Sequence, residues 1–162
     1  EVSAIIFDIA NHPFFAKVLS PTQLKKDIAN DIVRQTLMLI NTTDENDFTS
    51  FRAKDIDTFV EWYNEHVDEK DIIILKSALS FLDEKFTEKL NLKSTSLPMM
   101  LYAAYTCVKN EKDFDKFTNI VQTFVDSYGN DIDYVQYCTS GTSSAQSVQG
   151  RFNYWKNLCK GL

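Results

Sequence analysis

Apolar residues recur at helical spacing along most of this chain, in segments separated by polar or proline-containing breaks. Side chains three or four residues apart lie on one face of an α-helix, so each segment predicts an amphipathic helix. The run Ile72–Leu75 has the composition of a buried strand, but the apolar period continues beyond it at helical spacing for three more turns. We therefore expect helices at about 2–10, 20–40, 54–66, 69–90, 94–108, 114–128 and 144–158.

Local signals support several of these boundaries. His12-Pro13 ends the first segment, because the residue before a proline avoids the helical region. Ser20-Pro21 is typical of an N-cap followed by proline in the first helical position, and Gly129-Asn130 is typical of a helix end. Only 4 Gly and 3 Pro leave little for the tight turns of an all-β protein. The prediction is an all-α fold, a single compact bundle of six or seven amphipathic helices.

The 162 residues suit one domain, spanning 1–162. Because the sequence begins at Glu1 rather than Met, we expect a fragment of a longer protein. No apolar run approaches the roughly 18 residues of a membrane span, so we expect no membrane partner. Three cysteines without a C-x-x-C pair predict buried or half-buried free thiols in a reducing compartment, hence a cytoplasmic protein.

Charge is distributed unevenly around the net value of −6. Residues 44–71 contain ten acidic and three basic side chains, whereas no acidic residue follows Asp133. The acidic segment is either a solvated helix face or a surface for a basic partner. An anion is expected to bind only at the acid-free C-terminal end.

Small hydroxyl side chains surround one glycine in that end, in Ser140–Ser144 ahead of the last predicted helix. Free backbone N–H groups at a helix start attract anions, and Arg151 follows within the helix. Candidate contacts for an anion or nucleic acid are therefore Gly141, Thr142, Ser143 and Arg151. The simpler alternative is that Ser143 or Ser144 caps the helix, Gly141 adopts a left-handed turn and Arg151 pairs with an acid elsewhere.

Other chemistry has little support in the sequence. Residues 44–55 superficially resemble a calcium loop but lack its glycine and its final glutamate. The two histidines, His12 and His66, have no partners at metal-ligand spacing, and neither glycine-rich nucleotide motif occurs. Aromatic residues crowd the C-terminal end, where packing is favoured over stacking on bases. We therefore expect no catalytic residue, no metal and no cofactor.

The motif Tyr-x-x-Tyr-Cys-x-x-Gly-Thr-x-Ser, at 134–144, is followed by Val148-x-x-Arg151, and Ser20-Pro21-x-Gln23-Leu24 opens an aliphatic helix far upstream. This order of features resembles the helical region that follows the ParB/sulfiredoxin-like domain in GmrSD-type restriction proteins and their phage or mobile-element relatives. In that family the preceding domain carries the nucleotide chemistry, in a D-G-Q-Q-R-type motif that this chain lacks. The resemblance thus implies a bacterial, restriction-related helical part without its catalytic domain.

Two functions follow as expectations. The first is a non-enzymatic helical module of a DNA-processing or phage-defence-related protein, contacting nucleic acid or a partner domain through its acid-free end. The alternative is a small acidic interaction module, of inhibitor or antitoxin type, that binds a basic partner through Asp55, Glu61 and Glu65. A protein partner is expected in either case, with nucleic acid a weaker candidate because the chain is acidic.

Overall fold

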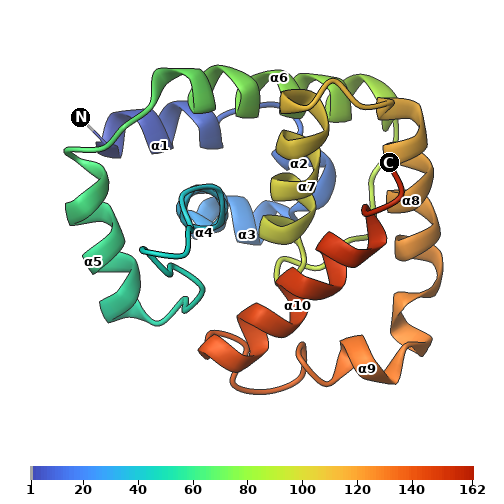
Figure 1. The fold of residues 1–162 in the computed structure, drawn as a ribbon. Coiled ribbons are helices and arrows are strands. Elements are labelled where there is room, and N and C mark those ends of the chain that lie inside the picture. Colours follow the sequence, from blue (N-terminus) through green and yellow to red (C-terminus); the bar gives the residue numbers. More distant parts are fainter. Residues whose placement is uncertain (1) are drawn as a thin grey trace.

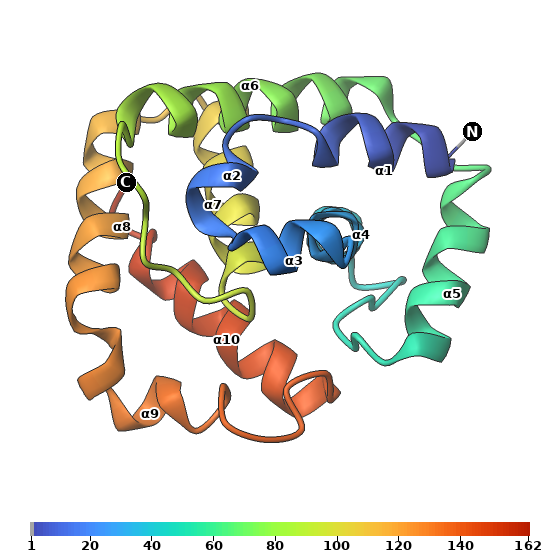
Figure 2. The same ribbon diagram turned by 180° about the vertical axis from the view of Figure 1, so that it is seen from behind.

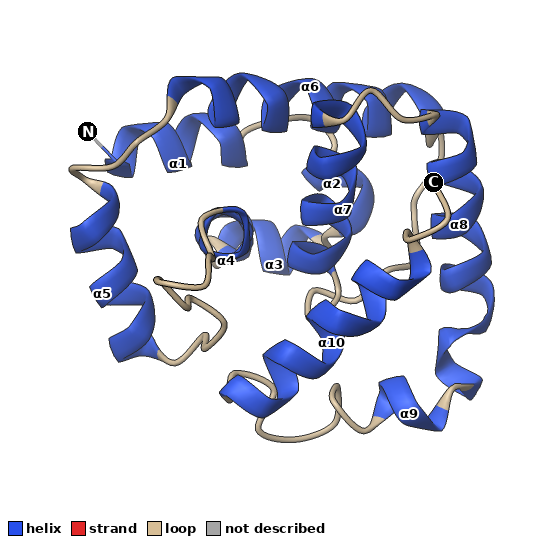
Figure 3. Ribbon diagram, in the orientation of Figure 1, coloured by secondary structure: helices blue, strands red, loops and turns tan. Residues whose placement is uncertain are grey.

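The computed structural model describes residues 2–162, and this part of the chain contains α-helices and one 3₁₀ turn but no β-strand (Figure 3). The all-α prediction is confirmed, while the predicted count of six or seven helices is wrong. The ten helices are α1 (Val2–Ala10), α2 (Phe15–Val18), α3 (Pro21–Lys25), α4 (Ile28–Ile40), α5 (Ala53–Tyr63), α6 (Glu69–Lys85), α7 (Leu97–Lys109), α8 (Phe114–Ser127), α9 (Ile132–Val135) and α10 (Ala145–Leu158).

The additional helices come from short turns and from one break. The predicted helix over 20–40 divides at Asp27, whose φ of 57° is left-handed and cannot continue a right-handed helix. The four-residue helices α2 and α9 are too short to show a clear apolar period in the sequence. After α8 the chain tightens into a 3₁₀ turn at Tyr128–Asn130, and Gly129 has no left-handed φ.

The predicted helix over 69–90 ends early, at Lys85. Residues 86–96 instead form a non-helical connection that buries Leu90 and Leu92. The backbone N–H of Leu90 donates to the carbonyl oxygen of Lys17, 2.9 Å away, which ties this segment to α2. In the sequence Leu90 resembles the continuation of a helical stripe, but a non-helical backbone buries it.

Helix starts follow the predicted capping chemistry. Ser20 accepts a hydrogen bond from the N–H of Gln23, whose side chain accepts from the Ser20 N–H, which completes a capping box ahead of Pro21. Ser144 caps α10 by accepting from the N–H of Ser147 at 3.3 Å. Both helices therefore begin where the sequence indicates.

Helix α7 lies at the centre of the fold and packs against α4, α6, α8 and α10 (Figures 1 and 2). Nine of its thirteen residues are buried. The buried apolar side chains of the described residues form one continuous cluster that extends from α1 to α10. Because α10 also packs on α7, the C-terminal helix is held against the middle of this core.

Helix α5 lies at the periphery, on the left in Figure 1, and its main helix neighbour is α4. It buries only Phe59 and Tyr63. The ring of Phe48, from the preceding loop, packs edge-on against Phe59 at 4.9 Å between centroids. The acidic segment is thus attached to the core through a small aromatic cluster.

Candidate functional site

The turn before α10 has the geometry that the capping alternative predicts. Gly141 has a φ of 56°, a conformation that favours glycine. Its carbonyl oxygen accepts from the N–H of Ser144 at 3.0 Å, and Ser144, rather than Ser143, caps the helix. Gly141 and Ser143 are exposed and Thr142 is half-buried.

A carboxylate lies close to this turn although the sequence around it is acid-free. The backbone N–H of Phe51 donates to the carbonyl oxygen of Ser143 at 2.9 Å, so the loop between α4 and α5 runs alongside. Gln149, in the first turns of α10, donates to Thr49 Oγ1 at 2.8 Å and reaches Asp47 Oδ2 at 3.5 Å. The start of α10 therefore faces an acidic loop, which weakens its attraction for anions.

Arg151 does not face solvent. It is 2% exposed, and its Nη1 donates to the carbonyl oxygen of Tyr137 at 2.7 Å. Within residues 2–162 it pairs with no carboxylate, and its buried Nε has no hydrogen-bond partner. Burial lowers the pKa of the guanidinium. Arg151 is thus neither the surface contact for nucleic acid nor the ion-pair partner of an acid that the sequence suggested.

The residues of the tyrosine motif contact one another and the core. The Tyr137 ring packs directly on Gly150, where a Cβ atom would lie 2.5 Å from the ring. The Tyr134 hydroxyl is 2.5 Å from Ser96 Oγ, at the start of α7, and Tyr134 is fully buried. Phe152 and Trp155 are buried too, which confirms packing rather than base stacking for these aromatics.

The acidic residues Asp55, Glu61 and Glu65 are all exposed, and only Glu61 lines a groove. Glu61 lines a groove between α1, α4 and α5, and the other charged residues of that groove are Asp31, Arg34 and Asp57. Asp55 and Glu65 do not line the groove, and Asp55 accepts a hydrogen bond from Ser50 Oγ at 2.6 Å. Two further acidic residues, Asp31 and Asp57, therefore lie beside Glu61 in this groove.

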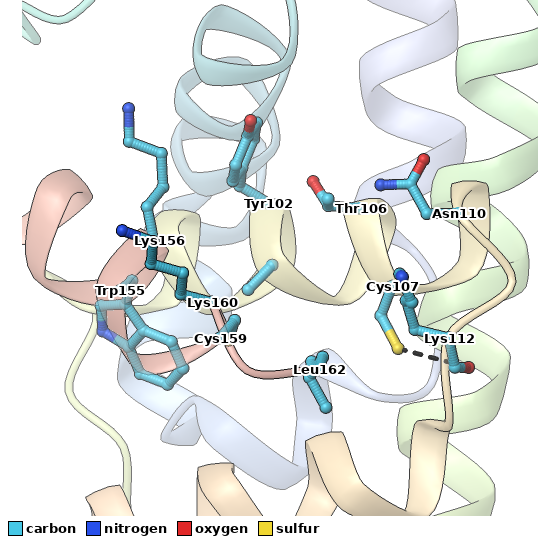
Figure 4. Close-up of a pocket in the computed structure, with 11 residues that line it drawn as sticks. Tyr102, Thr106, Cys107, Asn110, Lys112, Trp155, Lys156, Cys159, Lys160 and Leu162 are labelled. Carbon is cyan, nitrogen blue, oxygen red and sulfur yellow. Dashed lines mark hydrogen bonds between the residues drawn. The ribbon is translucent and has the colours of Figure 1, made fainter.

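A pocket that the sequence did not reveal lies where α7 meets the end of α10 (Figure 4). Its volume is about 320 Å³. Figure 4 shows Tyr102, Thr106 and Asn110 along one side of α7, with Leu162 on the other side of this helix in the view. The remaining lining residues are Ala103, Cys107, Lys112, Trp155, Lys156, Cys159 and Lys160.

Three lysines and no acidic residue line this pocket. Lys112 comes from the α7–α8 connection, while Lys156 and Lys160 follow one another by four residues at the end of α10. The Lys156 Nζ lies 4.2 Å from the centroid of the Phe152 ring, one helical turn earlier in α10. The exposed positive charges of the C-terminal end therefore lie at this pocket, whereas Arg151 is buried.

The two thiols of the pocket are weak nucleophiles. Burial, with a smaller contribution from Cys107, raises the pKa of Cys159 to about 11. Burial also raises the pKa of Cys107, whose Sγ donates to the carbonyl oxygen of Lys112 at 3.7 Å. Both thiols are protonated at neutral pH and form part of the apolar wall of the pocket.

The sequence contains the spacing of some lining residues within each helix, although it does not reveal the pocket. Tyr102, Thr106 and Asn110 form an i, i+4 series, and Lys156 and Lys160 form another. Nothing local indicates that these two series face each other, because α8, a 3₁₀ turn, α9 and the connections between them separate α7 from α10. Only the tertiary packing of α10 on α7 creates the pocket.

Comparison with protein-family models, curated proteins and solved structures finds no match to this chain. Residues 2–162 contain no cluster of three or more His, Cys, Asp or Glu side chains placed to hold a metal ion. None of the helices in the described range has the length and apolar character needed to cross a membrane.

Proposed function

We propose that this chain is a non-enzymatic helical module of a DNA-processing or phage-defence-related protein. In this proposal Lys112, Lys156 and Lys160 contact an anionic partner, either nucleic acid or a partner domain, at the C-terminal end. The observation that supports it best is the gathering of these three lysines around one pocket that no acidic side chain lines. The restriction-related context rests on the resemblance of the motif at 134–151.

The charges of these lysines are available to a partner. The ion pairs among residues 2–162 use Lys17, Arg34, Lys76 and Lys85, so none of them involves the pocket lysines. Lys156 and Lys160 are exposed. Ammonium groups of this kind hold phosphates or carboxylates as point charges.

Binding of a short DNA duplex, followed by fluorescence anisotropy at increasing salt, tests the nucleic-acid form of this proposal. We expect weak binding at low salt, with a log–log salt slope of about 0.9 for each phosphate that the protein neutralises. The variant Lys156→Gln/Lys160→Gln should reduce both affinity and slope. Its matched control, Lys25→Gln/Lys26→Gln, changes two exposed lysines remote in sequence.

Equal reductions of affinity in the two double variants would contradict a specific contact at the C-terminal end. Binding that responds neither to salt nor to the lysine substitutions would contradict phosphate contact altogether. If no DNA binds even at low salt, nucleic acid is rejected as the partner. The same lysine substitutions then test binding to a partner domain.

The second candidate function is the acidic interaction module. It is favoured by the exposure of Asp55, Glu61 and Glu65 and by the further acids in the groove beside Glu61. Reversal of these three residues to lysine should abolish binding of a polylysine peptide at low salt. Reversal of the exposed Glu84, Glu88 and Asp126 provides a control of equal charge change. Equal effects of both triple variants would show only a dependence on net charge and would reject a specific face.

A further inference from the structure

We propose that the pocket between α7 and α10 is a binding site for a small amphipathic carboxylate. The apolar tail would occupy the space between the two helices, and the carboxylate would meet the lysines. This inference does not rest on the proposed function, because it concerns a molecule small enough to enter the pocket.

The interior of the pocket is suited to an apolar tail. Ala103 and Cys107 line it from α7, and Cys159 and Leu162 line it from the C-terminal end. Trp155, itself fully buried, is a further lining residue. A volume of about 320 Å³ lies at the lower end of the usual range for small-molecule sites, roughly 300–1,000 Å³. The site therefore fits a short tail and not a large cofactor.

The polar part of the pocket is cationic. The side chains of Lys112, Lys156 and Lys160 carry three positive charges, and no acidic side chain lines the pocket to compensate them. The neutral polar groups are Tyr102, Thr106 and Asn110, which occupy one side of α7 in Figure 4 and can orient a ligand by hydrogen bonding. A buried tail with a cationic rim selects an anionic amphipath over a neutral or cationic one.

The partial negative charges at the C-terminal ends of two helices oppose the binding of an anion, but more weakly than the lysines favour it. Both α7 and α10 end near the pocket, and each helix C-terminus carries roughly half a negative charge. The last carbonyls of α7 are largely occupied, since Cys107 O accepts from Lys112 N and Val108 O accepts from Glu111 N. Three full positive charges outweigh two partial negative ones, so the pocket stays favourable for an anion.

Binding is expected to be reversible. The thiols of Cys107 and Cys159 are protonated, and the Cys107 Sγ already donates to a backbone carbonyl. A carboxylate is moreover a poor electrophile. No covalent step is therefore part of the proposal.

The test uses Trp155 as the reporter in the full chain. The protein has two tryptophans, so Trp62→Phe leaves Trp155 as the only one. Octanoate, octanol and octyltrimethylammonium, each below its aggregation concentration, serve as probes of equal chain length and different charge. We expect a saturable change of Trp155 fluorescence with octanoate, at an affinity at least about tenfold higher than for either other probe.

Two kinds of variant locate the site. Lys112→Gln/Lys160→Gln should weaken octanoate binding by roughly three- to tenfold and leave octanol binding unchanged, whereas Lys25→Gln/Lys26→Gln should change neither. Ala103→Leu should reduce binding of every probe by filling the pocket, with thermal unfolding as the check that this variant folds. Equal affinity for the three probes, no saturation with octanoate, or an undiminished affinity in Lys112→Gln/Lys160→Gln would each overturn the proposal.

Discussion

Arg151 is a buried cation whose guanidinium donates to a backbone carbonyl and lacks an acidic partner among residues 2–162. Arg151→Ala removes this bond and leaves a cavity, so the free energy of unfolding should fall by about 2–4 kcal/mol in urea titrations. Arg151→Met retains most of the volume and removes the desolvated charge, so its cost should stay below about 1.5 kcal/mol. An unchanged free energy of unfolding in Arg151→Ala would contradict the buried position of this side chain.

The variant Arg151→Met also tests whether Arg151 contacts nucleic acid. If Arg151 contacted phosphate, Arg151→Met would lower the salt slope of DNA binding by about 0.9. Because the side chain is buried, we expect the slope to remain that of the unmodified protein. A decreased slope in a stably folded Arg151→Met variant would show that the guanidinium reaches solvent.

Gly150 is a helix-interior glycine that contacts the ring of Tyr137. Alanine in place of glycine usually stabilises a helix by up to about 1 kcal/mol, but here the added Cβ would lie 2.5 Å from the ring. We expect Gly150→Ala to destabilise the fold by about 1–3 kcal/mol in urea titrations.

Removal of the ring should reverse the sign of this effect. In a Tyr137→Ala background, Gly150→Ala should be stabilising, and a double-mutant cycle measures the difference. Gly129→Ala is the matched control, since a Cβ there meets nothing within 4 Å. Simple additivity of the Tyr137 and Gly150 substitutions would contradict the contact.

His12 links stability to pH. Its Nδ1 accepts a hydrogen bond from the Phe14 N–H at 3.1 Å, which requires an unprotonated nitrogen. Burial lowers the pKa of His12 below 6.5, with a smaller opposing effect of Asp83. The folded state therefore binds fewer protons than the unfolded chain near this pH, and its stability falls as pH drops through 6.5 towards the folded pKa.

His12→Asn keeps an acceptor for Phe14 but does not titrate. Urea titrations between pH 7.5 and 5 should show a smaller loss of stability on acidification for this variant than for the unmodified protein. Identical pH profiles would mean that His12 has the same pKa in the folded and unfolded states.

At the scale of elements, the end of α7 is a Schellman motif built with an unfavourable residue. The N–H of Lys112 donates to Cys107 O at 2.9 Å and that of Glu111 to Val108 O at 3.1 Å. Glu111, at the left-handed position, has a φ of 53°, which favours glycine. Glu111→Gly should therefore stabilise the protein by about 0.5–1 kcal/mol, an increase in Tm of about 1–4 °C by calorimetry. Glu111→Ala is the control and should give no increase, because alanine retains the Cβ strain.

Elements were predictable where the information is local. The N-caps Ser20 and Ser144 and the apolar stripes placed seven helices, because capping and amphipathicity act within a few residues. The break at Asp27 was not predictable, since the apolar stripe runs through it and aspartate only tolerates a left-handed φ. Leu90 was wrongly assigned to a helix, because a packed non-helical segment buries the same residue types as a helix.

Site residues were predicted less well, because their roles depend on tertiary packing. The helix start at Ser144 was correct, yet its surroundings include Asp47, about a hundred residues away in sequence. Arg151 shows no sign of burial in the sequence, where a lone arginine in an acid-free segment favours a surface contact. The pocket at α7 and α10 needed the pairing of distant helices, which no single-sequence pattern indicates.

At the scale of the whole molecule, stability should be graded from the centre to the periphery. Helix α7 packs against four other helices and buries most of its length, whereas α5 has α4 as its main helix neighbour and buries two side chains. Native-state amide hydrogen exchange follows local opening, and segments with few buried contacts open at lower free energy than the core. Amides of α7 should thus exchange slowest, by global unfolding, and those of α5 at least about tenfold faster through local opening.

A substitution in the aromatic cluster that attaches α5 to the core tests this difference in local stability between α5 and α7. Phe48→Ala removes the ring that packs on Phe59 and Trp62. Because Phe48 lies in the loop ahead of α5, its removal should accelerate exchange in α5 more than in α7. Equal acceleration in both helices would mean that α5 unfolds only with the core, and the acidic segment would then be as rigid as the rest of the molecule. Selective acceleration in α5 would show instead that the acidic face can move independently of the C-terminal pocket, so that the two candidate binding surfaces operate on separately stable parts of the fold.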